Sequence, residues 1–290
     1  MRHKNILVYF TALTLLFSFQ NIEAQWVNKK GDGYFKLSAW YLETDQHYTD
    51  TGEIDPNVTR GNFNLNLYAD YGITDNWDIV AYIPFYARTY QNDVVSGTTG
   101  ETIEQGESIN SIGDIDIGIE YKLYHSQKIS ISTTLTLGLP TGESQGGSDG
   151  SYQTGDGEFN QFLKVGLGLP FKIKNASLYS KAYFGFNNKT KDFSDEFRAG
   201  LEFGLSLFNK KVWLIARSDI VESFKNGSLN AQNSQGSIFA NNIEYIGLGG
   251  EISYLFSKKI GFSLNYTGAI SGRIIAANPS ISAGVFFNLK

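Results

Sequence analysis

The strongest constraint on the fold is an alternation of apolar and polar residues with a period of two. From Asn62 to Tyr71 the odd positions are Phe, Leu, Leu, Ala and Tyr, and the even positions are Asn, Asn, Asn, Tyr and Asp. A helix would repeat its apolar residues about every 3.6 positions, so this segment is a strand with one apolar and one polar face. The same alternation returns in 114–123, 129–139 and 260–266.

Twelve segments fit this description, and nearly all reach the roughly 9–11 residues that a membrane-spanning strand needs. Their expected ranges are 33–44, 61–73, 77–90, 113–124, 128–139, 158–169, 176–187, 196–208, 211–222, 242–256, 259–270 and 279–289. Short connections alternate with longer, polar ones rich in Gly and Ser, at 45–60, 91–112, 140–157, 188–195, 223–241 and 271–278. Bacterial outer-membrane barrels have short periplasmic turns and longer external loops. The sequence therefore predicts an all-β protein, an antiparallel up-and-down transmembrane β-barrel of about 12 strands.

The N-terminus has the pattern of a secretory signal peptide. Arg2 and Lys4 precede an apolar run at 6–19, and Ala24 offers a small residue for cleavage. An uncleaved anchor helix is the alternative, but the run is shorter than the roughly 20 residues that such a helix needs. We therefore expect a signal peptide at 1–24 and an outer-membrane barrel domain at 25–290, with both termini of the mature chain in the periplasm.

Charge and composition exclude several classes of protein. The chain carries a formal net charge of −5 and no cysteine. An acidic chain without a clustered basic surface is not expected to bind nucleic acid. Without cysteine there are no disulfides and no thiolate metal sites, and we expect no metal or other cofactor. The oligomeric state is left open.

We expect the polar face of the strands to line the lumen, because charges within a membrane face the barrel interior or water. The expected pore-lining residues are Asp70, Asp78, Tyr82, Arg88, Asp114, Asp116, Glu120, Lys122, Lys164, Lys181, Arg198, Glu202, Arg217, Asp219 and Glu251. These side chains either form salt bridges that hold the wall in shape or select a passing solute. Aromatic residues near the strand ends, such as Trp77 and Phe197, are expected to form two girdles at the membrane interfaces.

Catalysis is not expected, and we identify no catalytic residue. Two histidines lie in the predicted mature chain, His47 in an external loop and His125 next to Ser126 in a short turn. Adjacent residues on a turn do not give the nucleophile, base and orienting group that hydrolysis needs.

Two motifs carry a family resemblance. The segment 112–123, with Gly113, Asp114 and Gly118, resembles the "GxGDxxxGxxYxL" strand of outer-membrane transporters called the MetA-pathway phenol-degradation family. The segment 138–142 resembles the "LPTG" strand end that follows this strand. The first motif departs from the family pattern, because Ser rather than Gly precedes Ile112. The resemblance implies a barrel that admits small, often aromatic or hydrophobic, compounds across the outer membrane. A purely structural role in closing the barrel also explains both motifs.

The sequence thus predicts an outer-membrane channel or transporter for small solutes, including hydrophobic or aromatic ones, by passive diffusion through a lumen of mixed charge. The alternative is a structural or adhesive surface barrel with a closed lumen and functional extracellular loops. The expected partners are outer-membrane lipid, lipopolysaccharide, the barrel-assembly machinery and the small-molecule solute.

Overall fold

The computed structural model describes residues 27–173, 176–228 and 237–290, so the expected signal peptide lies outside the described residues. These ranges contain strands, turns and loops. They include no helix that is long and apolar enough to cross a membrane.

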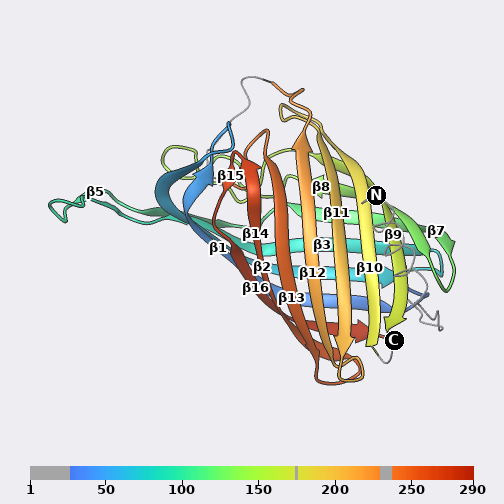
Figure 1. Cartoon of the computed structure of the whole chain (residues 1–290). Coiled ribbons are helices and arrows are strands. Elements are labelled where there is room, and N and C mark those ends of the chain that lie inside the picture. Colours follow the sequence, from blue (N-terminus) through green and yellow to red (C-terminus); the bar gives the residue numbers. More distant parts are fainter. Residues whose placement is uncertain (1–26, 174–175, 229–236) are drawn as a thin grey trace, which may run out of the picture.

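Twelve antiparallel strands form the wall of a closed barrel (Figure 1). The sheet closes because β1 pairs with β2 on one side and with β16 on the other. The wall strands are β1 (Gly33–Tyr48), β2 (Ile54–Gly72), β3 (Trp77–Gln91), β7 (Ile115–His125), β8 (Ser130–Leu139), β9 (Asn160–Ile173), β10 (Ala176–Lys189), β11 (Glu196–Leu207), β12 (Val212–Ser223), β13 (Glu244–Leu255), β14 (Ile260–Arg273) and β16 (Ser280–Leu289). The expected fold class is confirmed.

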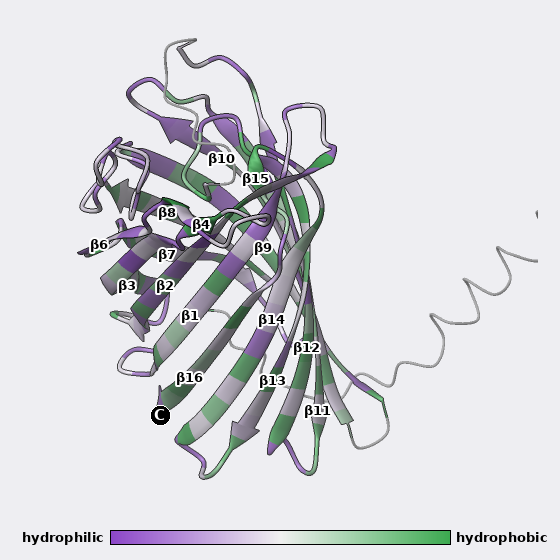
Figure 2. Ribbon diagram, turned by 90° about the vertical axis from the view of Figure 1, so that its left-hand side faces the viewer, coloured by the Kyte–Doolittle hydropathy of each residue, from purple (hydrophilic) through white to green (hydrophobic). Residues whose placement is uncertain are grey.

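The alternation gives the wall two different faces, seen as changing hydropathy along each strand in Figure 2. Register preserves the faces, since Leu37 of β1 lies opposite Leu67 of β2, and Ser38 lies opposite Asn66. Outward aliphatic side chains are exposed, by 50% at Ile119 and 51% at Leu201. A belt of exposed apolar side chains is what lipid contact requires of a membrane barrel.

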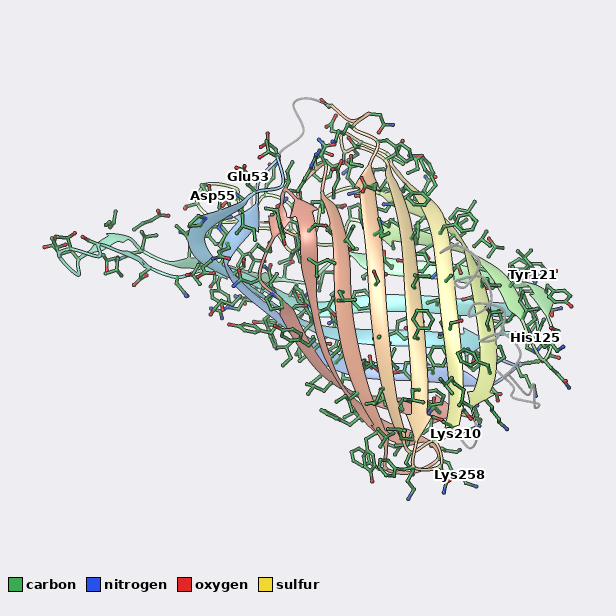
Figure 3. All side chains as sticks on the ribbon, in the orientation of Figure 1. Glu53, Asp55, Tyr121, His125, Lys210 and Lys258 are labelled. Atoms are coloured by element: carbon green, nitrogen blue, oxygen red, sulfur yellow. The ribbon has the colours of Figure 1, made fainter. Side chains whose placement is uncertain are left out.

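The barrel has a short-turn end and a long-loop end. The turns at 73–76, 126–129, 208–211 and 256–259 lie at the short-turn end, where Gly33 also pairs with Leu289. Figure 3 shows Glu53 and Asp55 at the long-loop end and His125 at the opposite end. Aromatic rings gather near both ends, as expected of girdles: Trp77 and Tyr121 are 4.5 Å apart, and Phe186 and Phe224 are 5.7 Å apart.

The long-loop end is more structured than the sequence indicated. β1 and β2 continue through most of the expected loop 45–60 and turn only at 49–53. The expected loop 91–112 contains β4 (Val94–Val95), β5 (Thr102–Glu104) and β6 (Glu107–Ser111). β4 and β5 form a hairpin that projects away from the barrel (Figure 1), while β6 pairs with β3. A further strand, β15 (Ile275–Ala276), pairs with the end of β1.

A β-bulge in β3 places one residue that we expected in the lumen, Arg88, on the outward face. Leu65 pairs with Tyr86 and Asn66 pairs with Pro84, so Phe85 is an extra residue and the faces exchange beyond it. Arg88 therefore lies opposite Phe63, on the outward face, and is exposed. Its guanidinium donates to Ser108 Oγ at 3.3 Å, so Arg88 does not line the lumen.

Candidate functional site: the barrel lumen

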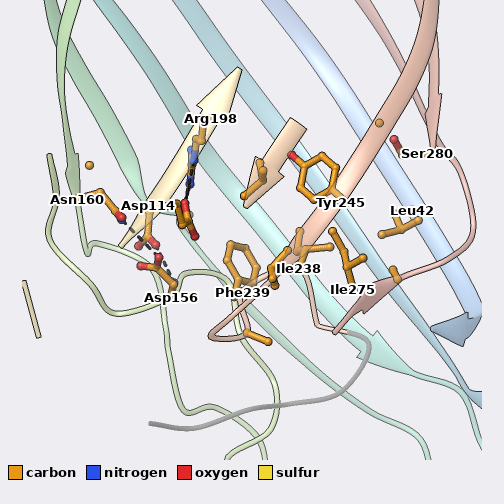
Figure 4. A pocket seen from close by; sticks show the side chains of 18 of the residues that line it. Leu42, Asp114, Asp156, Asn160, Arg198, Ile238, Phe239, Tyr245, Ile275 and Ser280 are labelled. Atoms are coloured by element: carbon orange, nitrogen blue, oxygen red, sulfur yellow. Dashed lines mark hydrogen bonds and ion pairs between the residues drawn. The ribbon is translucent and has the colours of Figure 1, made fainter. Parts of the chain in front are cut away.

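The lumen holds a cavity of about 510 Å³ toward the long-loop end (Figure 4). Wall strands and inward-folded loop residues both line it. One wall is charged and polar: Asp114, Asp116, Asp156, Asn160, Asn187, Lys189, Glu196 and Arg198. The other is mostly apolar: Trp40, Leu42, Ile238, Phe239, Ala240, Ile243, Tyr245, Ile275 and Ala276. A cavity of this size and two-sided character suits a small amphipathic molecule.

The charged wall is built around Lys189, the last residue of β10. Its ammonium group lies 3.2 Å from Asp156 and 3.0 Å from Glu196, and its side chain is only 6% exposed. Arg198 binds Glu196 as well, donating through Nε at 2.8 Å and Nη2 at 2.5 Å. Asn187 donates to Glu196 at 3.2 Å. These bonds tie the loop before β9 to the ends of β10 and β11.

Asp114 lies just outside β7 and acts as a clamp on the β8–β9 loop. Its carboxylate accepts the backbone N–H of Gly142 at 2.9 Å and that of Asp156 at 2.8 Å. Burial raises the pKa of the Asp114 carboxyl to about 6, while the Gly142 N–H acts in the opposite direction. The single carboxylate thereby fixes both the start and the end of this loop.

The two sequence motifs meet at this clamp. Thr141 Oγ1 donates to the carbonyl oxygen of Gly113 at 2.7 Å and accepts the N–H of Ile115 at 3.2 Å. With the bond from Gly142 to Asp114, three hydrogen bonds that involve side chains link the first motif to the second, in addition to the backbone pairing of β7 with β8. This geometry gives the two motifs a physical reason to occur together, namely that they hold the loop over the lumen.

Replacing Asp114 with alanine is expected to release the β8–β9 loop. Two backbone N–H groups would lose their acceptor, at about 1–3 kcal/mol for each group left buried and unpaired. Hydrogen exchange should accelerate across 140–159 and stay slow in the wall strands. The control is Asp149→Ala in the same loop, since Asp149 is exposed and its hydrogen bonds are to the nearby residue Ser151. Equal exchange in both variants would contradict the clamp.

A ladder of ion pairs crosses the inner wall nearer the short-turn end. Arg217 lies 2.5 Å from Glu202 and 2.9 Å from Glu251, while Lys36 approaches Glu251 at 3.6 Å and Lys181 approaches Glu202 at 3.7 Å. These ion pairs connect five strands, namely β10, β11, β12, β13 and β1. The Lys181 side chain faces inward yet is 46% exposed, so protein does not fill the lumen beside it.

Inward tyrosines lie against inward glycines on the neighbouring strand. The Tyr179 ring covers Gly204, where an added Cβ would stand 2.1 Å from it, and Tyr183 covers Gly200 in the same way. Tyr179 donates its hydroxyl to Glu202 at 2.7 Å, and Tyr183 donates to Asp219 at 2.8 Å. The space that these glycines leave is thus occupied by rings, which stiffen the wall.

The mouth at the short-turn end is narrowed by the segment before β1. Asn28 donates its backbone N–H to Asp78 at 2.6 Å, and its amide Nδ2 donates to Asp70 and to Asp78, each at 2.9 Å. Val27 is 1% exposed and Asp78 is fully buried. The segment therefore sits inside the mouth against β2 and β3.

The other expected lumen residues also face inward. Tyr82 lines the cavity and lies opposite Asp116 in the ladder between β3 and β7. Lys164 lies over the Tyr183 ring, and Glu120 lies opposite Thr134. Lys122, at the rim of the mouth, donates to the carbonyl oxygen of Asp75. The part that each of these residues plays toward a solute stays a prediction.

The two histidines occupy different surroundings. His125 ends β7 and is exposed at the short-turn end. His47 differs from the expectation of a loop residue, because it lies in β1 and is 3% exposed.

Several residues that line the lumen were not predicted from the sequence. Asp156, Lys189 and Glu196 lie beyond the apolar stripes, where the alternation no longer marks a face. Lys36 belongs to the inward-facing set of alternating positions in β1, so the sequence pattern could have identified it. The apolar run Ile238–Ala240 within a polar loop was a further signal that the loop folds inward.

Comparisons with known proteins concern the fold. No family model and no curated protein matches the sequence. The structure is similar to an outer-membrane channel from Pseudomonas putida F1, with 11% identity over 93% of this chain and 100% of that chain and a TM-score of 0.60. It is also similar to the translocator domain of the autotransporter NalP from Neisseria meningitidis, with 11% identity over 98% of this chain and 95% of that chain and a TM-score of 0.51. A third similar structure is the beta domain of the Bordetella autotransporter Brka, with 16% identity over 90% of this chain and 100% of that chain and a TM-score of 0.50. The chain has the fold of outer-membrane β-barrels.

Proposed function

We propose that this protein is an outer-membrane channel that admits small amphipathic solutes, aromatic ones included, by passive diffusion. The observation that carries the proposal is the 510 Å³ cavity within the lumen, with a charged wall facing an apolar one. Selection would follow from the width of the path and from the groups that line it. On the inner wall, Asp219 lies beside the cavity residue Gly247, and the exposed Lys181 lies nearer the short-turn end.

The proposal includes an orientation. The long-loop end faces the outside of the cell and the short-turn end faces the periplasm, as is usual for bacterial barrels. Solutes then meet the two-sided cavity first and the mouth narrowed by Asn28 last. Lipid and lipopolysaccharide surround the wall, and the barrel-assembly machinery inserts it.

Single-channel conductance of the refolded mature protein in a planar bilayer tests the proposal. An open path predicts steady current steps whose size rises with salt concentration. Folding is checked separately by the change in gel mobility between unheated and heated samples. A folded barrel that carries no current and admits no solute into vesicles would contradict the channel.

A surface role is the second candidate, and the projecting β4–β5 hairpin favours it. Ile103 is 72% exposed and Val95 is 52% exposed on this hairpin. The apolar side chains of this projecting hairpin are free to contact another molecule, and a solute path through the lumen does not need them. Deleting 93–105 separates the two candidates, since conductance should persist while any adhesive function disappears.

A further inference from the structure

We propose that the lumen cavity recognises small amphipathic cations, and that Asp116 is the residue that selects their positive charge. The proposal rests on the proposed function and names the class of solute that this channel prefers. The preferred molecule has an apolar, often aromatic, body and a protonated amine.

Asp116 differs from the other carboxylates of the cavity. Asp114 is occupied by two backbone N–H groups, Asp156 binds Lys189, and Glu196 binds Lys189 and Arg198. Asp116 lines the same cavity, and although Arg198 is near enough to attract it, its carboxylate accepts no hydrogen bond and forms no ion pair within 4.0 Å among the described residues. A carboxylate facing a cavity without a partner favours a donor, and most strongly a charged one.

The bases of the cavity are already bound. Lys189 lies between Asp156 and Glu196, and Arg198 gives two of its nitrogens to Glu196. The wall contains more acids than bases, so its residual charge is negative. An anionic solute would meet this negative wall, whereas a cationic solute would balance it.

Aromatic and apolar groups complete the recognition. Tyr82 lies directly across the strand pair from Asp116, and a ring face beside a carboxylate is a favourable place for an ammonium group. The wall formed by Phe239, Tyr245 and Ile275 can then contact the apolar body of the same molecule (Figure 4). Neither half of the cavity alone would distinguish such a molecule from a simple cation or a simple hydrocarbon.

Three probes of similar shape test the charge preference: phenethylamine, 2-phenylethanol and phenylacetate. At neutral pH they are a cation, a neutral molecule and an anion. Trp40 lines the cavity, so binding to the refolded mature barrel is followed by its fluorescence, with Trp40→Phe showing which part of the signal comes from the cavity. We expect phenethylamine to bind most tightly and phenylacetate least tightly.

Asp116→Asn should weaken phenethylamine binding by roughly tenfold, the size expected for one charge-assisted interaction, and leave 2-phenylethanol almost unchanged. Asp219→Asn is the matched control, because Asp219 is a lumen carboxylate outside the cavity that already accepts from Tyr183. The control should retain the preference for the cation. Unchanged preference in Asp116→Asn, or tighter binding of phenylacetate than of phenethylamine, would overturn the inference.

Conductance measurements keep this inference separate from the proposed function. If the protein carries current in a planar bilayer and none of the three probes binds with preference, the channel stands and the charge selection fails. If phenethylamine binds through Asp116 but the folded protein carries no current, the inference about the cavity stands and the channel fails.

Discussion

Replacing Gly247 with tryptophan is expected to reduce solute entry into vesicles to the rate of protein-free vesicles. Gly247 lies on β13 and lines the cavity, and a Cβ added there meets Tyr245 at 3.4 Å and Asp219 O at 3.7 Å, which are ordinary contacts. The new side chain can therefore be accommodated by the wall while its indole ring projects into the space that solutes need. Swelling of vesicles in the presence of phenylalanine, an aromatic zwitterion that crosses lipid alone only slowly, measures the effect.

Gly250→Trp is the matched control for the obstruction of the cavity by Gly247→Trp. Gly250 is on the same strand but faces outward, and a Cβ added there meets only Ile215 O at 3.7 Å. Its neighbours across the strands are Ala216 and Tyr266, on the membrane-facing surface. The control should admit solute like the wild type. Normal entry through folded Gly247→Trp would show that solutes do not use the cavity.

Replacing Lys189 with methionine is expected to lower the free energy of unfolding by about 3–5 kcal/mol, the cost of removing one partner from a buried ion pair. Methionine keeps much of the chain length and removes the ammonium group. Among the described residues, Asp156 then has no ion-pair partner and Glu196 keeps Arg198 alone. Urea unfolding from phospholipid vesicles, followed by gel mobility, measures the change.

Lys225→Met is the corresponding control. Lys225 pairs with Glu244 at 3.0 Å, but its side chain is 53% exposed. Exposed pairs contribute about 0–1 kcal/mol, so this variant should unfold close to the wild-type urea concentration. Equal losses in the two lysine variants would mean that burial of the Lys189 cluster does not stabilise the barrel.

The wall of the barrel was predictable because lipid imposes a simple rule on each strand. Leu65 and Leu67 must face lipid, so Asn64 and Asn66 must face inward, and the structure has this arrangement. Strand number, order and antiparallel pairing followed from the same rule. The long-loop end obeys no such rule, because the continuation of β1 and β2 beyond the membrane carries no apolar stripe.

Arg88 shows how one local irregularity changes a site prediction. The alternation up to Ile83 was extended unchanged to Arg88, but Pro84 cannot donate to the strand ladder and commonly marks a bulge. The proline was therefore the signal of the exchange of faces. Inward orientation was predictable for Asp116 and Arg198, but their different bonding was not. That difference depends on Glu196 and on the loop carrying Asp156.

The seam between β1 and β16 also determines how the barrel must assemble. Most neighbouring wall strands follow one another in the chain, whereas the seam joins Gly33 to Leu289. Local hairpins form quickly, while a contact between distant residues bears a larger loss of chain entropy. We therefore expect closure of the seam, where Tyr34 stacks on Phe286 at 5.6 Å, to be the slow kinetic step of folding. Weakening this contact should then slow insertion into vesicles more than an equally destabilising change elsewhere in the wall.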